Sequence, residues 1–244
     1  MNRKIKIGIV IAIVLICSFF FYYYFIDCNH AEKTATDMIN GTENVSVIKV
    51  DSGLFLDGPG NDTALIFYPG AKVEYISYLP MLMNISASGV DCYLVQMPFN
   101  FALLGQNEAD AIINNTNYSH YVLSGHSVGG IAAASYAANA DKVDGVILLS
   151  AYPNVNLTKP VLSIYGSQDK VLNIETYNES KALMANLTEF VIEGGNHEQF
   201  AYYGEQSGDG IATISPESQQ KQAVDKIIEF INSLKWLNLK KIRF

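Results

Sequence analysis

Cysteine is scarce in this chain, with three residues in 244. Cys17 and Cys28 lie in or just after an apolar segment near the N-terminus, and Cys92 lies alone in an apolar run further on. Domains that depend on disulfides carry several cysteines at regular spacings. The sequence therefore excludes a disulfide framework, and the fold must rely on a hydrophobic core.

Basic residues are also few, with 16 Lys and Arg against 24 Asp and Glu and a formal net charge of −8. Many of the basic residues lie at the two ends of the chain, so the segment between them is more acidic than the total suggests. These terminal residues are Arg3, Lys4, Lys6, Lys235, Lys240, Lys241 and Arg243. An acidic surface repels polyanions, and we therefore expect no nucleic-acid partner.

Charge is absent altogether from Ile7 to Ile26. An uncharged run of this length, about twenty residues, is what a helix needs to cross a hydrocarbon layer of ~30 Å. The basic residues before it and the acidic Asp27 and Glu32 after it predict a cytoplasmic N-terminus. The predicted organisation is a cytoplasmic basic tip (1–6), a transmembrane anchor (7–26), a linker (27–42) and an extracytoplasmic folded domain (43–244).

A cleaved signal peptide is the alternative interpretation of this segment. Signal peptides have an apolar core of about 7–15 residues followed by a small-x-small cleavage site. The apolar run here is longer, and Asn29-His30-Ala31 matches such a site poorly. Ile16 before Cys17 also fits a lipoprotein processing site poorly. We therefore expect an uncleaved anchor.

The rest of the chain alternates β-rich runs with helical stretches. Predicted strands cover 45–50, 53–57, 63–68, 91–96, 121–124, 145–150, 161–165 and 189–193, and predicted helices cover 75–88, 107–114, 128–138, 176–185 and 216–234. Such alternation is typical of a parallel sheet covered by helices. The length suits one domain of roughly 200 residues with a short appendage.

The sharpest motif is Gly125-His126-Ser127-Val128-Gly129. It follows a predicted strand and precedes an Ala-rich predicted helix, which is the context of a nucleophile elbow. A serine on such a tight turn needs strained backbone angles, and the flanking glycines leave room for the turn to pack. The motif predicts Ser127 as a catalytic nucleophile.

A serine hydroxyl needs a histidine to take its proton and a carboxylate to orient that histidine. In this kind of fold the acid and the histidine follow the serine in that order. Asp169 ends a Gly-containing loop after the predicted strand 161–165, which is the place of the acid. The alternative is that Asp169 only caps the next helix.

The chain has four histidines, which nearly determines the choice of base. His30 lies in the predicted linker, His120 precedes the nucleophile strand, and His126 belongs to the elbow. His197, in Glu193-Gly-Gly-Asn-His197, directly follows the last predicted strand. The order along the chain and elimination of the others both indicate His197.

A tetrahedral intermediate also needs backbone donors for its oxyanion. One is the N–H after the nucleophile, here Val128, and the other comes from the loop after an early strand. That loop is Tyr68-Pro-Gly-Ala-Lys-Val, in which we choose Ala71 as the donor. Lys72 beside it is either a contact for an anionic substrate group or a solvated surface residue. We expect neither a cofactor nor a metal ion.

These motifs together resemble a compact group of α/β-hydrolases. Its members carry a Tyr-Pro-Gly-Gly/Ala-Lys-Val oxyanion loop, a Gly-His-Ser-x-Gly-Gly elbow and a Gly-Gly-Asn-His histidine loop. The resemblance covers about residues 46–234 and includes the stretches 203–210 and 214–221 after the histidine. It implies a Ser-Asp-His hydrolase related to dienelactone hydrolases and carboxylesterases. Dienelactone hydrolases proper use cysteine where Ser127 stands, which argues against lactone specificity.

The resemblance also sets the expected architecture. We expect an α/β-hydrolase fold with a mostly parallel sheet, helices on both faces and no cap domain, preceded by one transmembrane helix. About ten residues separate the predicted strands 145–150 and 161–165, which leaves no room for a cap. The pocket should be open and bordered by apolar side chains. These are Phe99, Phe101, Leu103, Leu104, Tyr152 and Phe200, which could equally be packing residues.

The predicted function is hydrolysis of small-molecule or lipid-like carboxylic esters by a membrane-anchored serine hydrolase. One alternative is a catalytically silent binding module on the outer membrane face, since fold does not determine function. The presence of all three triad residues argues against it. The other is a lysophospholipase-like enzyme at a lipid surface, suggested by the anchor and by the basic and apolar tail 234–244.

Overall fold

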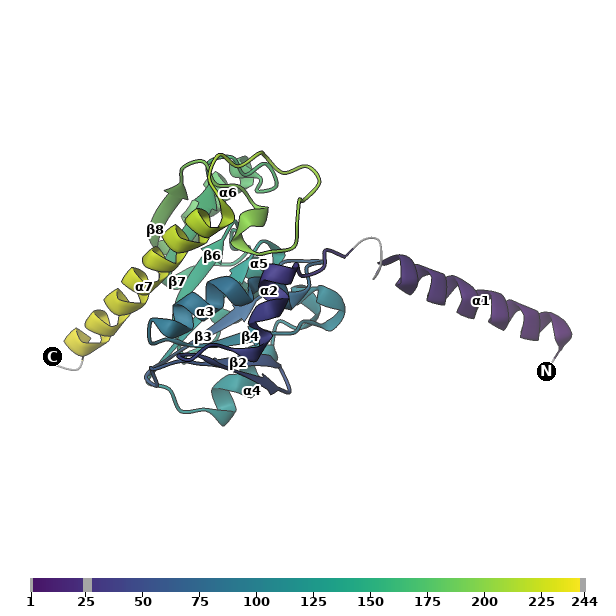
Figure 1. Ribbon diagram of the computed structural model, residues 1–244, viewed down its shortest axis with the longest axis horizontal. Coiled ribbons are helices and arrows are strands. Elements are labelled where there is room, and N and C mark those ends of the chain that lie inside the picture. The colour runs from purple at the N-terminus through teal and green to yellow at the C-terminus, as the bar shows by residue number, and fades with distance from the viewer. Residues whose placement is uncertain (1, 24–27, 242–244) are drawn as a thin grey trace.

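The structure is a computed structural model that describes residues 2–23 and 28–241, with side chains up to Lys235. A central sheet lies between two layers of helices, and helix α1 (Arg3–Tyr22) extends away from this body (Figure 1). The last residues of the predicted anchor, 24–26, and the first of the predicted linker, Asp27, lie outside the described residues. So do the tail residues 242–244.

The sheet has eight strands in the order β1-β2-β4-β3-β5-β6-β7-β8. Their bounds are β1 Ser46–Val50, β2 Gly53–Asp57, β3 Thr63–Tyr68, β4 Asp91–Val95, β5 His120–His126, β6 Val143–Leu149, β7 Leu157–Gly166 and β8 Met184–Ile192. The pairs β1–β2 and β2–β4 are antiparallel, and the pairs from β4 to β8 are parallel. The mostly parallel sheet that the sequence predicts is therefore confirmed.

Six α-helices belong to the body. They are α2 Lys33–Thr36, α3 Leu79–Ala87, α4 Glu108–Asn115, α5 Val128–Ala137, α6 Ile174–Ser180 and α7 Pro216–Lys241. Short 3₁₀ turns occupy Asp37–Asn40, Tyr75–Tyr78, Pro98–Asn100, Ala102–Leu104, Lys181–Leu183 and Glu198–Phe200.

The sheet is buried on both faces because its side chains alternate between two hydrophobic cores. On β3, Leu65 and Phe67 join α3 and α7 in one core, whereas Ala64, Ile66 and Tyr68 join α4 and α5 in the other. All six residues of β3 are buried. A continuous apolar run is what a central parallel strand requires.

The order of strands determines where a site can form. From β3 the chain crosses to β4 on one side of the sheet, and β5 then pairs with β3 on the other side. In open α/β sheets a crevice forms at the carboxyl ends of the strands where the direction of winding reverses. Here that point brings together the loops after β3 and β5, which are the predicted oxyanion loop and nucleophile elbow.

No cap domain is inserted between β6 and β7, since residues 150–156 connect the two strands without a helix or a strand. The expected absence of a cap is therefore confirmed. Ser127, at the carboxyl edge of the sheet, is partly exposed.

The prediction for the segment before β8 was wrong. A helix over 176–185 is expected from the sequence, but α6 ends at Ser180 and β8 already begins at Met184. The start of β8 pairs with β7, as in Leu157 with Met184 and Pro160 with Asn186. Pairing with a neighbouring strand therefore overrides the local helical preference of this short apolar run.

Helix α1 confirms the apolar segment as one helix long enough to span a membrane. Over its most apolar 18 residues the mean hydropathy is 2.5, and none of this window is buried in the body. The helix begins at Arg3, with Asn2 as its N-cap. A signal sequence near an N-terminus can pass the same test of length and hydropathy.

The predicted linker packs against the body where it is described. The Asn29 N–H donates to the Lys72 carbonyl at 2.7 Å, and the Glu74 N–H donates to the Asn29 carbonyl at 2.9 Å. Cys28 and Ala35 are buried. Asn29 therefore forms an isolated parallel β-bridge with Val73 in the loop that follows β3.

Candidate active site

Ser127 lies at a sharp turn between β5 and α5. Its φ of 52° and ψ of −125° are strained for a residue with a side chain. The Ser127 N–H donates to the Leu149 carbonyl at the end of β6, at 2.9 Å, which holds the turn against the neighbouring strand. The side chain is partly exposed at the carboxyl edge of the sheet. This is the geometry of a nucleophile elbow.

The glycines of the elbow are required by close backbone contacts. A Cβ on Gly125 would lie 2.4 Å from the Gly129 backbone, and a Cβ on Gly129 would lie 2.2 Å from the Tyr68 carbonyl oxygen. Both distances are far below van der Waals contact. The two glycines therefore let the elbow pack against itself and against the loop after β3.

Asp169 and His197 meet although 28 residues separate them. Asp169 follows β7, His197 follows β8, and the Asp169 Oδ2 lies 3.0 Å from the His197 Nδ1. Both side chains are almost fully buried, at 1% and 2% exposed. A carboxylate on Nδ1 places the proton there and leaves Nε2 as the basic nitrogen of the imidazole.

The second oxygen of Asp169 holds its own loop. Oδ1 accepts from the Val171 N–H at 2.9 Å and from the Leu172 N–H at 2.8 Å. The N-cap of α6 is Asn173, whose side chain accepts from the Thr176 N–H. Asp169 therefore stabilises a turn before the helix and does not cap the helix itself, unlike the alternative interpretation.

The surroundings of Asp169 favour its ionised form. Burial alone raises the pKa of this carboxyl, but the hydrogen bond and positive charge of His197 and the Leu172 N–H together bring the pKa below its usual value of 3.8. The carboxylate is therefore ionised at neutral pH, where it can stabilise a histidine that takes up a proton.

Asp209, which is not among the residues predicted from the sequence, holds the loop of His197. Its Oδ2 accepts from the N–H groups of His197 at 2.8 Å and Glu198 at 3.0 Å. Its Oδ1 accepts from the Lys170 N–H at 3.2 Å, next to Asp169. One carboxylate therefore links the loops of Asp169 and His197. The signal was present, because Asp209 lies in the stretch 203–210 that resembles the α/β-hydrolase group.

The other two expected site residues are Ala71 and Val128. Val128 is the first residue of α5, so its N–H has no acceptor within the helix. In the loop after β3, the Gly70 N–H donates to the Tyr78 Oη at 3.0 Å and the Lys72 N–H donates to the Asn100 carbonyl at 2.8 Å. Between them, the Ala71 N–H has no acceptor among the described residues. Both N–H groups are therefore available to a ligand.

A buried tyrosine links the predicted oxyanion loop to the elbow. The Tyr78 Oη accepts from the Gly70 N–H and lies 2.8 Å from the His126 Nδ1. Burial raises the pKa of Tyr78, so its hydroxyl keeps its proton, and that proton needs an acceptor. We infer that Tyr78 donates to Nδ1 of a neutral His126. Nothing in the sequence pattern singles out this tyrosine.

His126 also lies against the predicted base. Its ring centroid is 4.5 Å from that of His197 and 5.6 Å from that of Phe200. Burial, followed by the charge of His197, lowers the pKa of His126 well below its usual value. A neutral His126 does not oppose the uptake of a proton by His197.

We expect Tyr78→Phe to lower kcat about tenfold or more, because it removes the bond that holds the oxyanion loop beside the elbow. It also leaves the Gly70 N–H without its buried acceptor, which should cost about 1–3 kcal/mol of stability. The matched control is Tyr177→Phe, which removes a buried hydroxyl bonded to Ser163 and Glu189.

Ester-hydrolysis kinetics and denaturant unfolding on both variants provide the test. The control should lose stability but retain kcat. If kcat is unchanged in Tyr78→Phe, or equally reduced in both, the tyrosine does not position the site.

The apolar residues expected around the pocket fall into three groups. Phe200 is fully buried and supports His126, so its expected place at the border of an open pocket is wrong. Phe101 and Tyr152 are partly buried. The side chains of Phe99, Leu103 and Leu104 are exposed.

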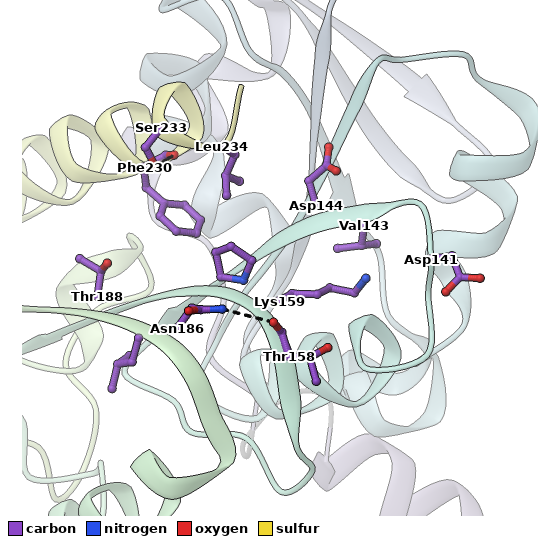
Figure 2. A pocket seen from close by; sticks show the side chains of 12 residues that line it. Asp141, Val143, Asp144, Thr158, Lys159, Asn186, Thr188, Phe230, Ser233 and Leu234 are labelled. Atoms are coloured by element: carbon purple, nitrogen blue, oxygen red, sulfur yellow. Dashed lines mark hydrogen bonds between the residues drawn. The ribbon is translucent and has the colours of Figure 1, made fainter. Parts of the chain in front are cut away.

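The structure also contains a separate cavity of about 750 Å³ (Figure 2). It is lined by residues near the amino ends of β6, β7 and β8 and by Phe230, Ser233 and Leu234 of α7. Asn186 donates to the Thr158 carbonyl in its wall at 3.4 Å. None of the predicted catalytic residues lines it. In the part of the chain that the structure describes, no three His, Cys, Asp or Glu side chains gather as metal ligands do.

Comparison with known proteins defines the class. A family model described as "Alpha/beta hydrolase family" matches residues 64–221, which is more than half of the chain. The chain therefore belongs to the α/β-hydrolase family, as its fold and its resemblance to that group predict. No curated protein sequence matches it.

Several solved structures share the fold. Est1E from Butyrivibrio proteoclasticus has a TM-score of 0.53 at 15% identity, with 79% of this chain and 99% of that chain covered. A CIB-like hydrolase from Thermoplasma acidophilum has a TM-score of 0.54 at 17% identity, with 75% and 97% covered. The epoxide hydrolase VrEH1 from Vigna radiata has a TM-score of 0.57 at 12% identity, with 79% and 99% covered. At such identities the likeness concerns the fold alone.

Proposed function

We propose that this protein is a serine hydrolase that cleaves carboxylic esters through an acyl-enzyme, with Ser127, His197 and Asp169 as its triad. The observation that carries the proposal is the buried Asp169–His197 pair, which lies at the same edge of the sheet as the strained turn of Ser127. A structural role would require neither a strained, partly exposed serine nor a histidine with a buried carboxylate on Nδ1.

In the proposed reaction, the Ser127 Oγ attacks the ester carbonyl carbon while the His197 Nε2 accepts the hydroxyl proton. The negative charge on the carbonyl oxygen is met by the N–H groups of Ala71 and Val128. Asp169 stabilises the imidazolium that forms. His197 then protonates the leaving alcohol, and the acyl group stays on Ser127. Water, activated by His197, attacks the acyl-enzyme and releases the acid.

The labelling experiment tests the nucleophile directly. The detergent-solubilised full chain should react with a fluorophosphonate probe and hydrolyse p-nitrophenyl butyrate, because a fluorophosphonate captures an activated serine. Ser127→Ala should lose both activities. Ser135→Ala is the matched control, since Ser135 lies on α5 and its hydroxyl bonds to Ile131 and Asn154.

A silent binding module would give no labelling of the wild-type chain at all. Equal labelling of Ser127→Ala and the wild type would remove Ser127 from the mechanism. Labelling that is lost only in Ser135→Ala would place the nucleophile elsewhere on α5.

We further propose that α1 remains attached as a membrane anchor, with its N-terminus in the cytoplasm and the body outside. The contacts of the segment after α1 support retention. Asn29 is bonded to the loop after β3, and the Ala31 N–H donates to a Glu74 carboxylate oxygen at 2.9 Å. Cleavage at Ala31 would separate these residues from the body to which they are bonded.

Protease added to intact cells should digest the body, since three basic residues before the apolar part of α1 favour an outside location for the domain after it. The body should sediment with membranes before digestion. Immunoblotting with an antibody against the body, before and after lysis, provides the measurement. Protection until lysis would contradict the orientation, and recovery of the body from the medium would contradict the anchor.

A further inference from the structure

We propose that the active site opens onto the membrane surface and takes lipid esters whose acyl chains lie in the outer leaflet. This inference rests on the proposed serine-esterase function and names its substrate class. It is carried by contacts that join the end of α1 to the oxyanion loop, together with an exposed apolar segment beside both.

A short chain segment joins the end of α1 to the part of the body beside the oxyanion loop. Helix α1 ends at Tyr22, and Asn29 is already paired with Val73 in the loop that contains Ala71. Six residue steps separate Tyr23 from Asn29, and an extended chain covers at most about 20 Å over that number. Asn29, which is bonded to the oxyanion loop, therefore lies within about 20 Å of Tyr23 at the end of α1.

The segment Pro98–Leu104 contacts both helix α1 and the oxyanion loop. The Tyr23 Oη donates to the Phe99 carbonyl at 2.5 Å, and the Phe20 and Phe99 ring centroids lie 5.8 Å apart. On the other side, the Asn100 carbonyl accepts from the Lys72 N–H at 2.8 Å. The segment therefore bridges the anchor and the site.

Several apolar side chains of the segment Pro98–Leu104 are exposed. The side chains of Phe99 and Leu104 are 59% and 62% exposed, and Leu103 is exposed beside them. Phe99 has a φ of 53° and Asn100 a φ of 49°. A positive φ is uncommon for a bulky aromatic residue and costs energy that exposure to water does not offset. Insertion into a lipid interface would offset that cost.

The location suits such insertion. Tyrosines are enriched where a membrane helix meets the headgroup layer, and Tyr22 and Tyr23 occupy that position at the end of α1. Apolar and aromatic side chains at this level bury their surface among the acyl chains. Because no cap stands over the carboxyl edge, an ester group at the headgroup level can reach Ser127 directly. The acidic charge of the body favours zwitterionic over anionic lipid.

The test compares two substrates on the full chain reconstituted in phosphatidylcholine vesicles. One is a long-chain ester that partitions into the vesicles, 4-methylumbelliferyl palmitate, and the other is water-soluble p-nitrophenyl acetate. The perturbing variant is Phe99→Asn/Leu104→Ser, which removes the apolar side chains and puts at position 99 a residue that tolerates a positive φ. Ile48→Ser, an exposed residue on the edge strand β1, is the matched control.

We expect the ratio of the palmitate rate to the acetate rate to fall at least tenfold in Phe99→Asn/Leu104→Ser and to stay unchanged in Ile48→Ser. A second variant inserts twenty Gly and Ser residues after Phe25, a linker with a mean span of roughly 25 Å. It should lower the same ratio, because it frees the site from the membrane surface without altering the body.

The outcomes separate this inference from the proposed function. If the wild type hydrolyses neither ester, the serine-esterase function itself fails. If it hydrolyses acetate normally while the ratio is unchanged in both variants, the esterase stands and the membrane-facing site is overturned. A lower ratio in Ile48→Ser as well would show that any polar substitution on the surface has this effect, and would also overturn the membrane-facing site.

Discussion

Replacing Ser127 with Ala should lower kcat by at least ~10⁴-fold, and His197→Ala should lower it by at least ~10³-fold, with little change in KM in either case. Both residues are proposed to act only in the transition state, whereas substrate binding depends on the rest of the site. The catalysis that remains should come from the oxyanion donors and from binding.

The decisive variant combines the changes. Members of a triad act as one unit, so their losses are far from additive. The triple variant Ser127→Ala/His197→Ala/Asp169→Asn should therefore be close in activity to Ser127→Ala alone. The rate of single-turnover hydrolysis of p-nitrophenyl butyrate is measured for the wild type, Ser127→Ala, His197→Ala and the triple variant. If the losses multiply, the three residues do not form one catalytic unit.

Asp169→Asn should lower kcat by ~10³-fold or more and leave stability nearly unchanged. The structure explains why the two effects separate. Oδ1 of Asp169 accepts from two backbone N–H groups, and an amide oxygen can replace it. Oδ2 accepts a hydrogen bond from the His197 Nδ1, and an amide NH₂ in that place cannot accept one. The imidazole would then take the wrong tautomer, with Nε2 protonated.

Kinetics and denaturant unfolding on the same preparation test this separation. The matched control is Asp209→Asn, in which the loops of acid and base lose a carboxylate that does not contact the imidazole ring. We expect it to reduce stability more than Asp169→Asn and kcat less. Near-wild-type kcat in Asp169→Asn would contradict the triad, and the acid would have to be sought at another strand end.

The sequence predicted most of the fold because its signals are local. The uncharged run 7–26, the apolar strand 63–68 and the elbow around Ser127 each depend on neighbouring residues. Each has the expected structure where it is described. The local helical preference did not predict the structure before β8, where pairing with strand β7 makes Met184 extended. Such a pairing depends on residues far away in the chain.

The candidate site also depends partly on local sequence signals and partly on contacts between distant segments. Ser127, Asp169, His197, Ala71 and Val128 could be chosen from motifs, from their order and from elimination among four histidines. Their catalytic roles stay predictions, although the contact between Asp169 and His197 is present. Tyr78 could not be chosen from its local sequence, because its importance lies in its bonds to other loops. Asp209 lies in a stretch that resembles the α/β-hydrolase group, but only the fold shows that it bonds to the loops of Asp169 and His197.

The sequence by itself determined the apolar helix, the alternation of strands and helices, and the residue types available for chemistry. These follow from short-range patterns of charge, hydrophobicity and turn residues. Only the tertiary structure decided that Asn29 pairs with the oxyanion loop and that Phe99 lies against the end of α1. Contacts between segments so far apart depend on strand order and on the burial of whole elements, and no local pattern encodes them. The position of the candidate site beside the end of α1 is therefore a property of the fold.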